Sequence, residues 1–394
     1  MSEIDILRVQ GDEAAEAWIP LGAYAFGETP PLWGHEEWER FVQHYTDPLQ
    51  LILFEDGKPV ASTARNCMTQ NVRGTLYPAG GIWGVAVHPA GRRKGYARQL
   101  VVEMLAAMRA EGNALSMLYP FRESFYARVG YTRFPQPRMA SFAPQPLLPL
   151  LSKELDGTVE LVEIKDGAER FMDYLEAYQR WHHGFGLFSR EQTVGDLRGE
   201  NKAWLALAQI DGNVVGAMTY ENKGDPRRML VRNFYYDDYR GRYLLLEWCA
   251  RHIDQIQEIE VKLAPEEQPD LWLEDLNPQF RAGFAPMGRV LDVTRLGGMA
   301  VGAGSVTLRI RDEQCPWNEG CFRFASLEGR LHVEAVGAVE PECELTSQGL
   351  AALIFGTHAP ETFALRGWGR VPPATQATLC SMFPRMQPYL HSMF

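Results

Sequence analysis

Residues 84–97 combine cations with small residues between a predicted strand and a predicted helix, a spacing that suits the binding of an anion. The stretch reads Gly84-Val85-Ala86-Val87-His88-Pro89-Ala90-Gly91-Arg92-Arg93-Lys94-Gly95-Tyr96-Ala97. Backbone N–H groups of a loop that leads into a helix point into one concavity, and the helix start adds partial positive charge. Gly95 has no Cβ, so a ligand can approach the backbone closely there. The loop predicts a cradle for a pyrophosphate, although taken alone it also fits a solvated turn.

The loop is neither of the two common nucleotide-binding loops, because G-x-x-x-x-G-K-[ST] and G-x-G-x-x-G are both absent from it. It resembles instead the acetyl-CoA signature of the GNAT superfamily, R/Q-x-x-G-x-G/A, with Arg92, Gly95 and Ala97 at the fixed positions. Residues 85–87 resemble the bulged strand of that family, whose backbone pairs with the pantetheine arm. Residues 119–131 resemble a later family motif, in which a tyrosine lies near the thioester sulfur.

The resemblance implies an N-acetyltransferase that uses acetyl-CoA as cosubstrate and holds no metal. It implies that the residues in contact with the cofactor are Val85, Ala86, Val87, Arg92, Arg93, Lys94, Gly95, Tyr96 and Ala97. A backbone N–H within residues 85–87 would stabilise the oxyanion of the tetrahedral intermediate.

Tyr126 is the candidate general acid. A phenol with a reference pKa of about 10 stays protonated at neutral pH and can protonate a leaving thiolate. The alternative is that Tyr126 only packs in the core beside Phe125 and Tyr131.

Aromatic residues and carboxylates before residue 40 are the candidate acceptor site, because GNAT acceptors usually contact the opening helices. Phe26, Glu28 and Trp33 represent this group. Such side chains suit polyamines and other cations through cation–π and ion-pair contacts. The alternative is that the aromatic residues belong to the core and the carboxylates to a solvated helix face.

The C-terminus is apolar, whereas an idle tail is normally polar. Burial of Met393 and Phe394 would each contribute roughly 1.5–3 kcal/mol. Burying Phe394 would carry the α-carboxylate with it, and in the Eis (enhanced intracellular survival) group, which the chain resembles, that carboxylate is the general base. The alternative is a docked tail with no chemical role.

Several elements are predicted to position these residues. A hairpin is expected from residues 51–54 and 60–63 around Asp56-Gly57, then a strand at 84–88, a helix from Tyr96 to Gly112 and a strand at 115–118. Prolines between 135 and 149 indicate a linker or domain boundary.

The middle of the chain repeats this order of elements. Strands at 204–208 and 213–216 flank Asp211-Gly212, a strand follows at 231–235, and a helix is expected at 243–256. Asp237 and Asp238 stand where the basic loop would be, and their charges would repel a pyrophosphate. The pattern predicts a duplicated domain and one active site per chain.

Alternating apolar residues at 306–310 and a capped helix near Thr346 predict an α+β layout after residue 289. The whole chain then resembles the Eis layout: an α/β (α+β) fold with a catalytic GNAT domain at 1–147, a degenerate GNAT-like domain at 148–288 and a sterol-carrier-protein-like domain at 289–394. Aminoglycosides are the acceptors typical of that group, with polyamines or lysines as alternatives, and it forms hexamers, so a homo-oligomer is expected.

Composition narrows the class of protein. A chain of 394 residues predicts two or three domains. A net charge of -11 argues against nucleic acid and favours a cationic substrate. Without a signal-like start or a run of about 20 apolar residues, the prediction is a cytoplasmic protein that does not bind membranes. A different class stays open, an acetyl-CoA-sensing protein whose sterol-carrier-like domain binds lipid.

Overall fold

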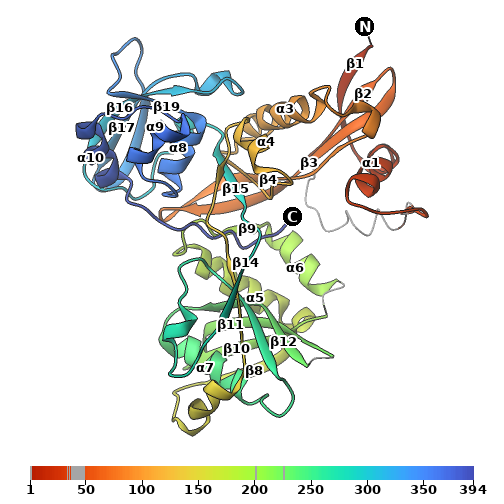
Figure 1. Ribbon diagram of the computed structural model, residues 1–394, viewed down its shortest axis with the longest axis vertical. Helices are drawn as coiled ribbons and strands as arrows, with labels where there is room; N and C mark the ends of the chain where they lie inside the picture. Colours follow the sequence, from red (N-terminus) through yellow and green to blue (C-terminus); the bar gives the residue numbers. More distant parts are fainter. Residues whose placement is uncertain (1, 33, 35, 37–48, 200–201, 225–226) are drawn as a thin grey trace. The chain divides into compact units, whose positions relative to one another are not determined.

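The computed structural model describes residues 2–394 apart from 33, 35, 37–48, 200–201 and 225–226 (Figure 1). The chain forms two compact units. The first contains Met1–Phe134, Gln179–Gln192 and Pro286–Phe394, and the second contains Pro135–Tyr178 and Thr193–Ala285. The fold is mixed α/β, as the sequence predicts.

An eight-stranded sheet is the frame of the first unit, in the order β1-β2-β3-β4-β5-β15-β6 with β9 beside β3. Its strands are β1 (Ile4–Val9), β2 (Leu49–Glu55), β3 (Lys58–Val72), β4 (Thr75–Val87), β5 (Leu115–Leu118), β6 (Thr132–Arg133), β9 (Gly186–Phe188) and β15 (Met287–Val290). The helices that accompany this sheet are α1 (Gly11–Ala25), α3 (Tyr96–Ala110) and α4 (Glu123–Ala127). β4 and β5 pair in parallel, and the other neighbours pair antiparallel.

The local predictions for this sheet are confirmed. β2 and β3 meet at Asp56-Gly57, where both φ angles are positive, +50° and +73°. A two-residue turn of this kind matches the twist of the paired strands, which explains the Asp-Gly sequence. α3 begins at Tyr96 and ends at Ala110, before Gly112 with φ +92°. Its predicted apolar positions are buried, namely Leu100, Val101, Met104, Leu105 and Met108.

The second unit has a seven-stranded sheet in the order β14-β7-β13-β12-β11-β10-β8. Its strands are β7 (Arg138–Phe142), β8 (Thr158–Glu163), β10 (Trp204–Ile210), β11 (Asn213–Lys223), β12 (Arg228–Tyr236), β13 (Glu258–Leu263) and β14 (Gln279–Ala282). The helices in this part of the chain are α5 (Ile164–Gln179), α6 (Arg190–Arg198) and α7 (Tyr239–Ala250).

The two sheets repeat one topology, which confirms the predicted duplication. Each has five strands in chain order with one parallel step between the fourth and fifth, β4–β5 and β12–β13. The strand beside the fifth one comes from a different part of the chain in each sheet. In the first sheet it is β15, which follows all strands of the second sheet in sequence. In the second sheet it is β7, which precedes the other strands of that sheet. Each sheet is therefore completed by a strand from the other half of the repeat.

The proline-rich stretch is more than a linker. The chain enters the second unit at Pro135, as a boundary there requires, but residues 138–142 form β7 inside the second sheet. This strand occupies the proline-free interval between Pro137 and Pro144, so its N–H groups can pair on both sides. The predicted boundary at 147/148 falls inside a 3-10 helix (Gln145–Ser152), and that at 288/289 falls inside β15.

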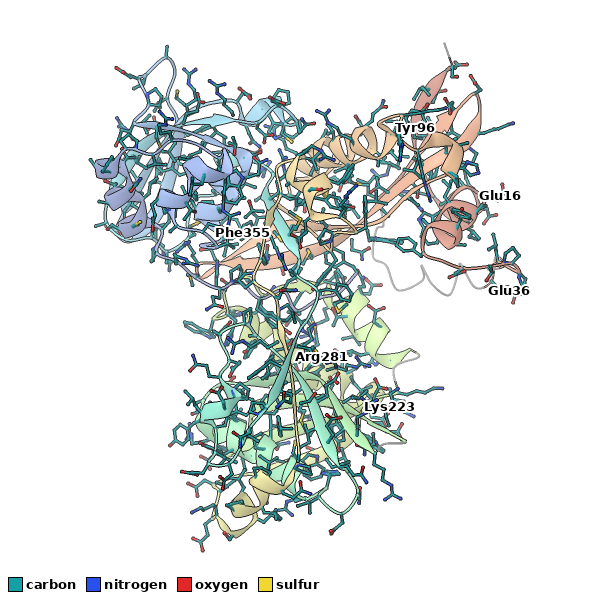
Figure 2. The ribbon with its side chains drawn as sticks, viewed as in Figure 1. Glu16, Glu36, Tyr96, Lys223, Arg281 and Phe355 are labelled. Atoms are coloured by element: carbon teal, nitrogen blue, oxygen red, sulfur yellow. The ribbon has the colours of Figure 1, made fainter. Side chains whose placement is uncertain are left out.

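Residues 291–394, here called the C-terminal region, form a four-stranded sheet in the order β18-β17-β16-β19. Its elements are β16 (Ser305–Arg311), β17 (Gly320–Leu327), β18 (Arg330–Ala335), β19 (Cys343–Thr346), α8 (Ser347–Ile354), α9 (Phe363–Arg366) and α10 (Pro373–Met382). As predicted, Val306, Leu308 and Ile310 are buried, and Thr346 caps α8 by accepting a hydrogen bond from the Gly349 N–H. Phe355, labelled in Figure 2, packs against Phe134 with ring centroids 4.8 Å apart, within a core that this region shares with the first sheet.

A buried arginine, Arg73, and a half-buried histidine, His183, join the β3–β4 turn to the end of α8. The Arg73 guanidinium donates hydrogen bonds to the carbonyl oxygens of Leu353 and Ile354, both at 3.0 Å, and so caps the helix C-terminus. The His183 ring accepts from the Arg73 N–H at 3.1 Å through Nδ1, and its Nε2 lies 2.9 Å from the Phe355 carbonyl oxygen. The ring is therefore the neutral Nε2–H tautomer, and burial lowers the pKa of His183 to about 4.

This histidine predicts a loss of stability in acid. Between the usual pKa of about 6.5 and the folded value, the unfolded chain binds a proton that the folded chain does not. The free energy of unfolding should fall as pH falls through that window, by up to about 3 kcal/mol from this group. Chemical denaturation between pH 7 and 4 measures it, with His183→Gln as the comparison. An identical pH slope in wild type and variant would assign the acid lability to other groups.

Candidate active site

A cavity of about 940 Å³ in the first unit brings the predicted site residues together. Its walls come from α1 and the segment to Glu28, from residues 82–87 of β4, from the basic loop and the start of α3, from residues 119–128, and from Phe394. The first and the last of these segments, α1 and Phe394, lie at opposite ends of the sequence.

The strand that lines the cavity is bulged. Ser62 pairs with Ala86 and Ala64 pairs with Trp83, so Gly84 and Val85 face Thr63 alone. Gly84 has φ +62°, and a Cβ there would lie 3.0 Å from the Trp18 Nε1, so both the backbone conformation and the close approach favour glycine. On the other side of β4, pairing with β5 ends at Ile82. Residues 83–87 therefore present backbone groups that β5 does not use.

The basic loop leads into an open helix start. Gly95, with φ +91°, is the N-cap of α3 and offers no side-chain acceptor to the first amides of the helix. The Arg93 φ is also positive, +64°. The Arg92 guanidinium lies 5.7 Å from the centre of the Tyr24 ring. An anion can therefore bind at the helix start without displacing a cap.

The corresponding helix of the second unit is closed to an anion. α7 starts at Tyr239 rather than Tyr243 because Asp238 caps its N-terminus, and it ends at Ala250 rather than Ile256. Its carboxylate accepts hydrogen bonds from the N–H groups of Arg240, at 2.9 Å, and Gly241, at 3.4 Å. The ends predicted from the helix periodicity are therefore wrong. The Asp238 carboxylate occupies the place at the helix start that a phosphate would need.

All but one of the predicted cofactor residues line the cavity. These are Val85, Ala86, Val87, Arg92, Arg93, Gly95, Tyr96 and Ala97. Lys94 is not among the lining residues, since its Nζ lies 2.8 Å from both carboxylate oxygens of Glu55. The Tyr96 hydroxyl donates to the same carboxylate at 2.7 Å. The Lys94 hydrogen bond is the largest cause that holds the pKa of Glu55 below its usual value.

Three further arginines on the cavity wall were missed. Arg98, Arg122 and Arg128 line it together with Arg92 and Arg93, whereas Glu28 is the one carboxylate side chain among the described lining residues. The local charge is thus opposite in sign to the net charge of -11. Arg98 lies three residues after Gly95, on the first turn of α3, and that spacing was the signal in the sequence. Such a cluster suits a ligand with several phosphates.

Tyr126 both packs in the core and reaches the cavity. It is 2% exposed, and its ring centroid lies 4.9 Å from Phe125, 5.4 Å from Phe121 and 6.0 Å from Tyr131. Burial raises the pKa of Tyr126 above its usual value, and no hydrogen bond contributes to the shift. The phenol is therefore held in its protonated form beside the cavity, as a proton donor requires.

The C-terminal residue closes one side of the cavity. The Phe394 ring packs against Gly81, where a Cβ would lie 2.8 Å from it, and lies 5.6 Å from both Tyr119 and Phe188. Ser392 anchors the tail, since its Oγ donates to the Gly186 carbonyl at 3.1 Å. The expected burial of Met393 is wrong, because its side chain is 60% exposed.

The predicted acceptor residues are only partly accounted for. Phe26 and Glu28 line the cavity, and Trp33 lies outside the described residues. Two aromatic residues that the sequence reasoning missed extend this wall: the Trp18 ring lies 5.9 Å from Trp83 and 6.5 Å from Phe26. The Trp83 Nε1 donates to the Asn66 Oδ1 at 2.8 Å, which fixes the plane of its ring.

Comparison with known proteins agrees with this geometry. Residues 7–134 match the acetyltransferase (GNAT) domain, and residues 293–391 match the sterol carrier protein domain. No curated protein matches the chain. The fold is similar to GCN5-related N-acetyltransferases from Anabaena variabilis (18% identity, 100% of both chains, TM-score 0.87) and Kribbella flavida (21% identity, 100% of this chain and 99% of that one, TM-score 0.85). It is also similar to Eis1 from Mycobacterium abscessus, at 15% identity over 100% of both chains and a TM-score of 0.78.

The chain therefore combines a GNAT acetyltransferase domain with a C-terminal sterol carrier protein domain. The protein is an acetyltransferase, and acetyl-CoA is the cosubstrate of the GNAT domain family, whose model matches residues 7–134.

The basic loop allows a direct test of cofactor binding. Arg92→Glu reverses a charge on the cavity wall, and Gly95→Trp forces a large side chain onto a backbone with φ +91°, so each should abolish acetyl-CoA binding with little effect on the fold. Calorimetry measures the affinity, with Arg240→Glu in the second unit as the matched control. If Arg92→Glu and Gly95→Trp both bind acetyl-CoA with unchanged affinity, the loop is not part of the cofactor site.

Proposed function

We propose that the protein transfers the acetyl group of acetyl-CoA to a primary amine of a small cationic acceptor, an aminoglycoside-like compound, a polyamine or a lysine side chain. One observation carries the proposal: a single cavity is lined by the basic loop, by Tyr126 and by Phe394. These are the groups that acetyl transfer needs for an anionic cofactor, a leaving thiolate and an ammonium ion.

The cofactor would lie between the arginines and β4. Its phosphates would contact Arg92, Arg93 and the uncapped start of α3. Its pantetheine arm would pair with the backbone of residues 83–87, which β5 leaves unpaired. A backbone N–H beside the bulge would stabilise the negative oxygen of the tetrahedral intermediate.

The acceptor ammonium ion loses one proton to the carboxylate of Phe394, directly or through a water, and the lone pair of the neutral amine then attacks the thioester carbonyl. The attacking nitrogen, now positively charged, loses a second proton to water. When the intermediate collapses, the C–S bond breaks, the sulfur takes the electron pair, and Tyr126 donates its proton to that sulfur and regains one from water. The burial that raises the pKa of Tyr126 supports this role.

The acceptor end of the cavity is aromatic. Trp18, Phe26 and Trp83 form one cluster, and an ammonium ion over such rings gains cation–π energy of about 0.5–2 kcal/mol. Glu28 adds a carboxylate to the same wall. These groups support a cationic acceptor, and they would suit an aminoglycoside-like compound, a polyamine and a lysine side chain alike.

A coupled assay tests the proposal. Purified protein is mixed with acetyl-CoA and a panel of aminoglycosides, polyamines and lysine peptides, and free thiol is followed with time. Acceptor-dependent thiol release is the expected result. Tight acetyl-CoA binding without release for any amine would favour the acetyl-CoA-sensing, lipid-binding alternative instead.

Among the described residues, no helix combines the length and apolar character needed to cross a membrane, and no group of three or more His, Cys, Asp or Glu side chains could hold a metal ion. A cytoplasmic location, the hexamer of the Eis group and the domain boundaries at 147/148 and 288/289 are carried forward on the sequence resemblance.

A further inference from the structure

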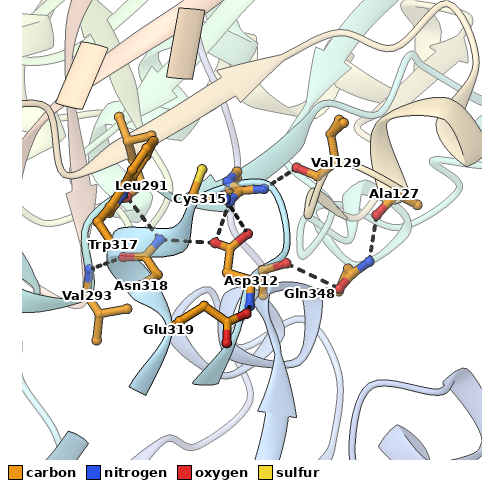
Figure 3. Close-up of polar contacts among 12 residues, drawn as sticks. Ala127, Val129, Leu291, Val293, Asp312, Cys315, Trp317, Asn318, Glu319 and Gln348 are labelled. Atoms are coloured by element: carbon orange, nitrogen blue, oxygen red, sulfur yellow. Dashed lines mark hydrogen bonds and ion pairs between the residues drawn. The ribbon is translucent and has the colours of Figure 1, made fainter. Parts of the chain in front are cut away.

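The short helix that carries Tyr126 is held from outside the GNAT segment. α4 has only five residues, too few to be stable alone. Its last carbonyl, Ala127 O, accepts a hydrogen bond at 2.6 Å from the Gln348 Nε2 of α8, in the C-terminal region (Figure 3). The Val129 carbonyl accepts a second hydrogen bond, from the Arg289 guanidinium of β15.

These two carbonyls are coupled to the Tyr126 backbone. The Tyr126 carbonyl accepts hydrogen bonds from the N–H groups of Val129, at 3.0 Å, and Tyr131, at 3.1 Å. The chain after α4 is thus one tight turn. A shift of the Ala127 or Val129 carbonyl would move the Tyr126 ring relative to the cavity.

Arg289 is itself fixed by the C-terminal region. Its side chain is fully buried and forms an ion pair with Asp312. The Asp312 carboxylate also accepts from the Cys315 N–H at 3.2 Å and from the Asn318 Nδ2 at 3.1 Å (Figure 3). A buried ion pair is weak evidence for added stability, because desolvation offsets the attraction. Its clear effect here is geometric, since it aims the guanidinium at Val129.

A third contact reaches the cavity wall from the same segment. The Arg98 Nε donates a hydrogen bond to the Gln314 Oε1 at 3.2 Å. Gln314 is two residues after Asp312, so one loop of the C-terminal region contacts both the cofactor side and the tyrosine side of the site.

We propose that Gln348 and Asp312, the latter through Arg289, are positioning residues that set the place of the Tyr126 hydroxyl, so that the sterol carrier domain is part of the transferase site. The inference rests on the proposed role of Tyr126. Displacing a reacting group by about 1 Å can cost about 10²-fold in rate. Loss of these contacts should therefore lower kcat and leave the KM for acetyl-CoA nearly unchanged.

The test is a double-mutant cycle. Gln348→Met has nearly the same shape but no N–H, and it should lower kcat at least tenfold. Gln348→Lys restores a donor and should recover part of the loss. In the Tyr126→Phe background, Gln348→Met should have little further effect, because both changes act on one proton transfer. If Gln348→Met lowers kcat by the same factor in the wild-type and Tyr126→Phe backgrounds, or keeps full kcat, the positioning role is wrong.

Tyr77→Phe is the matched control. The Tyr77 hydroxyl shares its one proton between the carbonyl oxygens of Leu296, at 2.9 Å, and Gly297, at 2.8 Å, so it also ties the first sheet to the C-terminal region. Tyr77 does not line the cavity, and its loss should lower the melting temperature without lowering kcat. An equal fall in kcat in Tyr77→Phe would mean that Gln348 acts through general stability.

A second readout does not depend on turnover. Asp312→Asn leaves the Arg289 charge without its partner and can unfold the protein, whereas Gln348→Met carries no such penalty. With fluorotyrosine at position 126, the ¹⁹F resonance should shift in Gln348→Met and stay in place in Tyr77→Phe. An unmoved resonance in Gln348→Met would contradict the proposal. Full kcat in Tyr126→Phe would instead refute the role of Tyr126, and the positioning role with it.

Discussion

Tyr126→Phe is expected to lower kcat by about 10²–10⁴-fold, the usual contribution of a general acid. The substitution keeps the ring, whose contacts with Phe121, Phe125 and Tyr131 hold the wall of the cavity, and it removes only the hydroxyl. The affinities for acetyl-CoA and for the acceptor should change little. Steady-state kinetics and calorimetry on the same preparation measure both.

The pH profile gives the same prediction a second check. Because burial raises the pKa of Tyr126, the phenol stays protonated well into the alkaline range, so wild-type kcat should show no loss from its ionisation below about pH 10. Tyr220→Phe, a buried tyrosine of the second unit, is the control for removing a phenol. Wild-type kcat in Tyr126→Phe would leave Tyr126 with a packing role only.

Moving the terminal carboxylate of Phe394 should lower kcat by an amount comparable to that expected for Tyr126→Phe. Appending a few residues after Phe394 retains the ring that packs on Gly81, but it converts the carboxylate into a peptide carbonyl. Deleting Phe394 removes the ring and leaves the terminal carboxylate one residue earlier, on Met393. Each change should lower kcat by about 10²-fold or more, the contribution of a general base. The melting temperature and acetyl-CoA binding should hold, since the tail anchor at Ser392 remains.

The appended and deleted chains separate two roles of the tail. Met393→Ala is the control, because that side chain is 60% exposed and is not on the cavity wall. If the extended chain keeps full activity with the tail still docked, the carboxylate has no part in the reaction and Phe394 only completes the wall.

Much of the cofactor side could be predicted from the sequence because its signals are local. A turn at Asp56-Gly57, a helix that starts after Gly95 and a strand that ends before Pro89 each depend on a few consecutive residues and their φ angles. The signature Arg92-x-x-Gly95-x-Ala97 lies in one such stretch, so its residues reach the cavity together.

Local sequence patterns gave wrong or incomplete predictions where a capping side chain or a distant strand partner determines the structure. The periodicity after Tyr243 indicated a helix but not its start at Tyr239, which depends on the Asp238 side chain. The prolines near 137 and 144 indicated a break, yet β7 between them has partners on both sides. β15 could not be assigned to the first sheet from sequence either, since its partner β5 is about 170 residues earlier in the chain.

The sequence by itself determined the class of chemistry, the candidate cofactor loop and the candidate acid, because each depends on a short run of adjacent residues. The tertiary structure alone decided which side chains share the cavity. In the structure Lys94 forms an ion pair with Glu55 instead of lining the cavity, and Arg98, Arg122 and Arg128 do line it. Phe394 packs against Gly81, more than 300 residues earlier in the chain. Side-chain direction and long-range contact depend on the packing of whole sheets, and no short stretch of sequence encodes that packing.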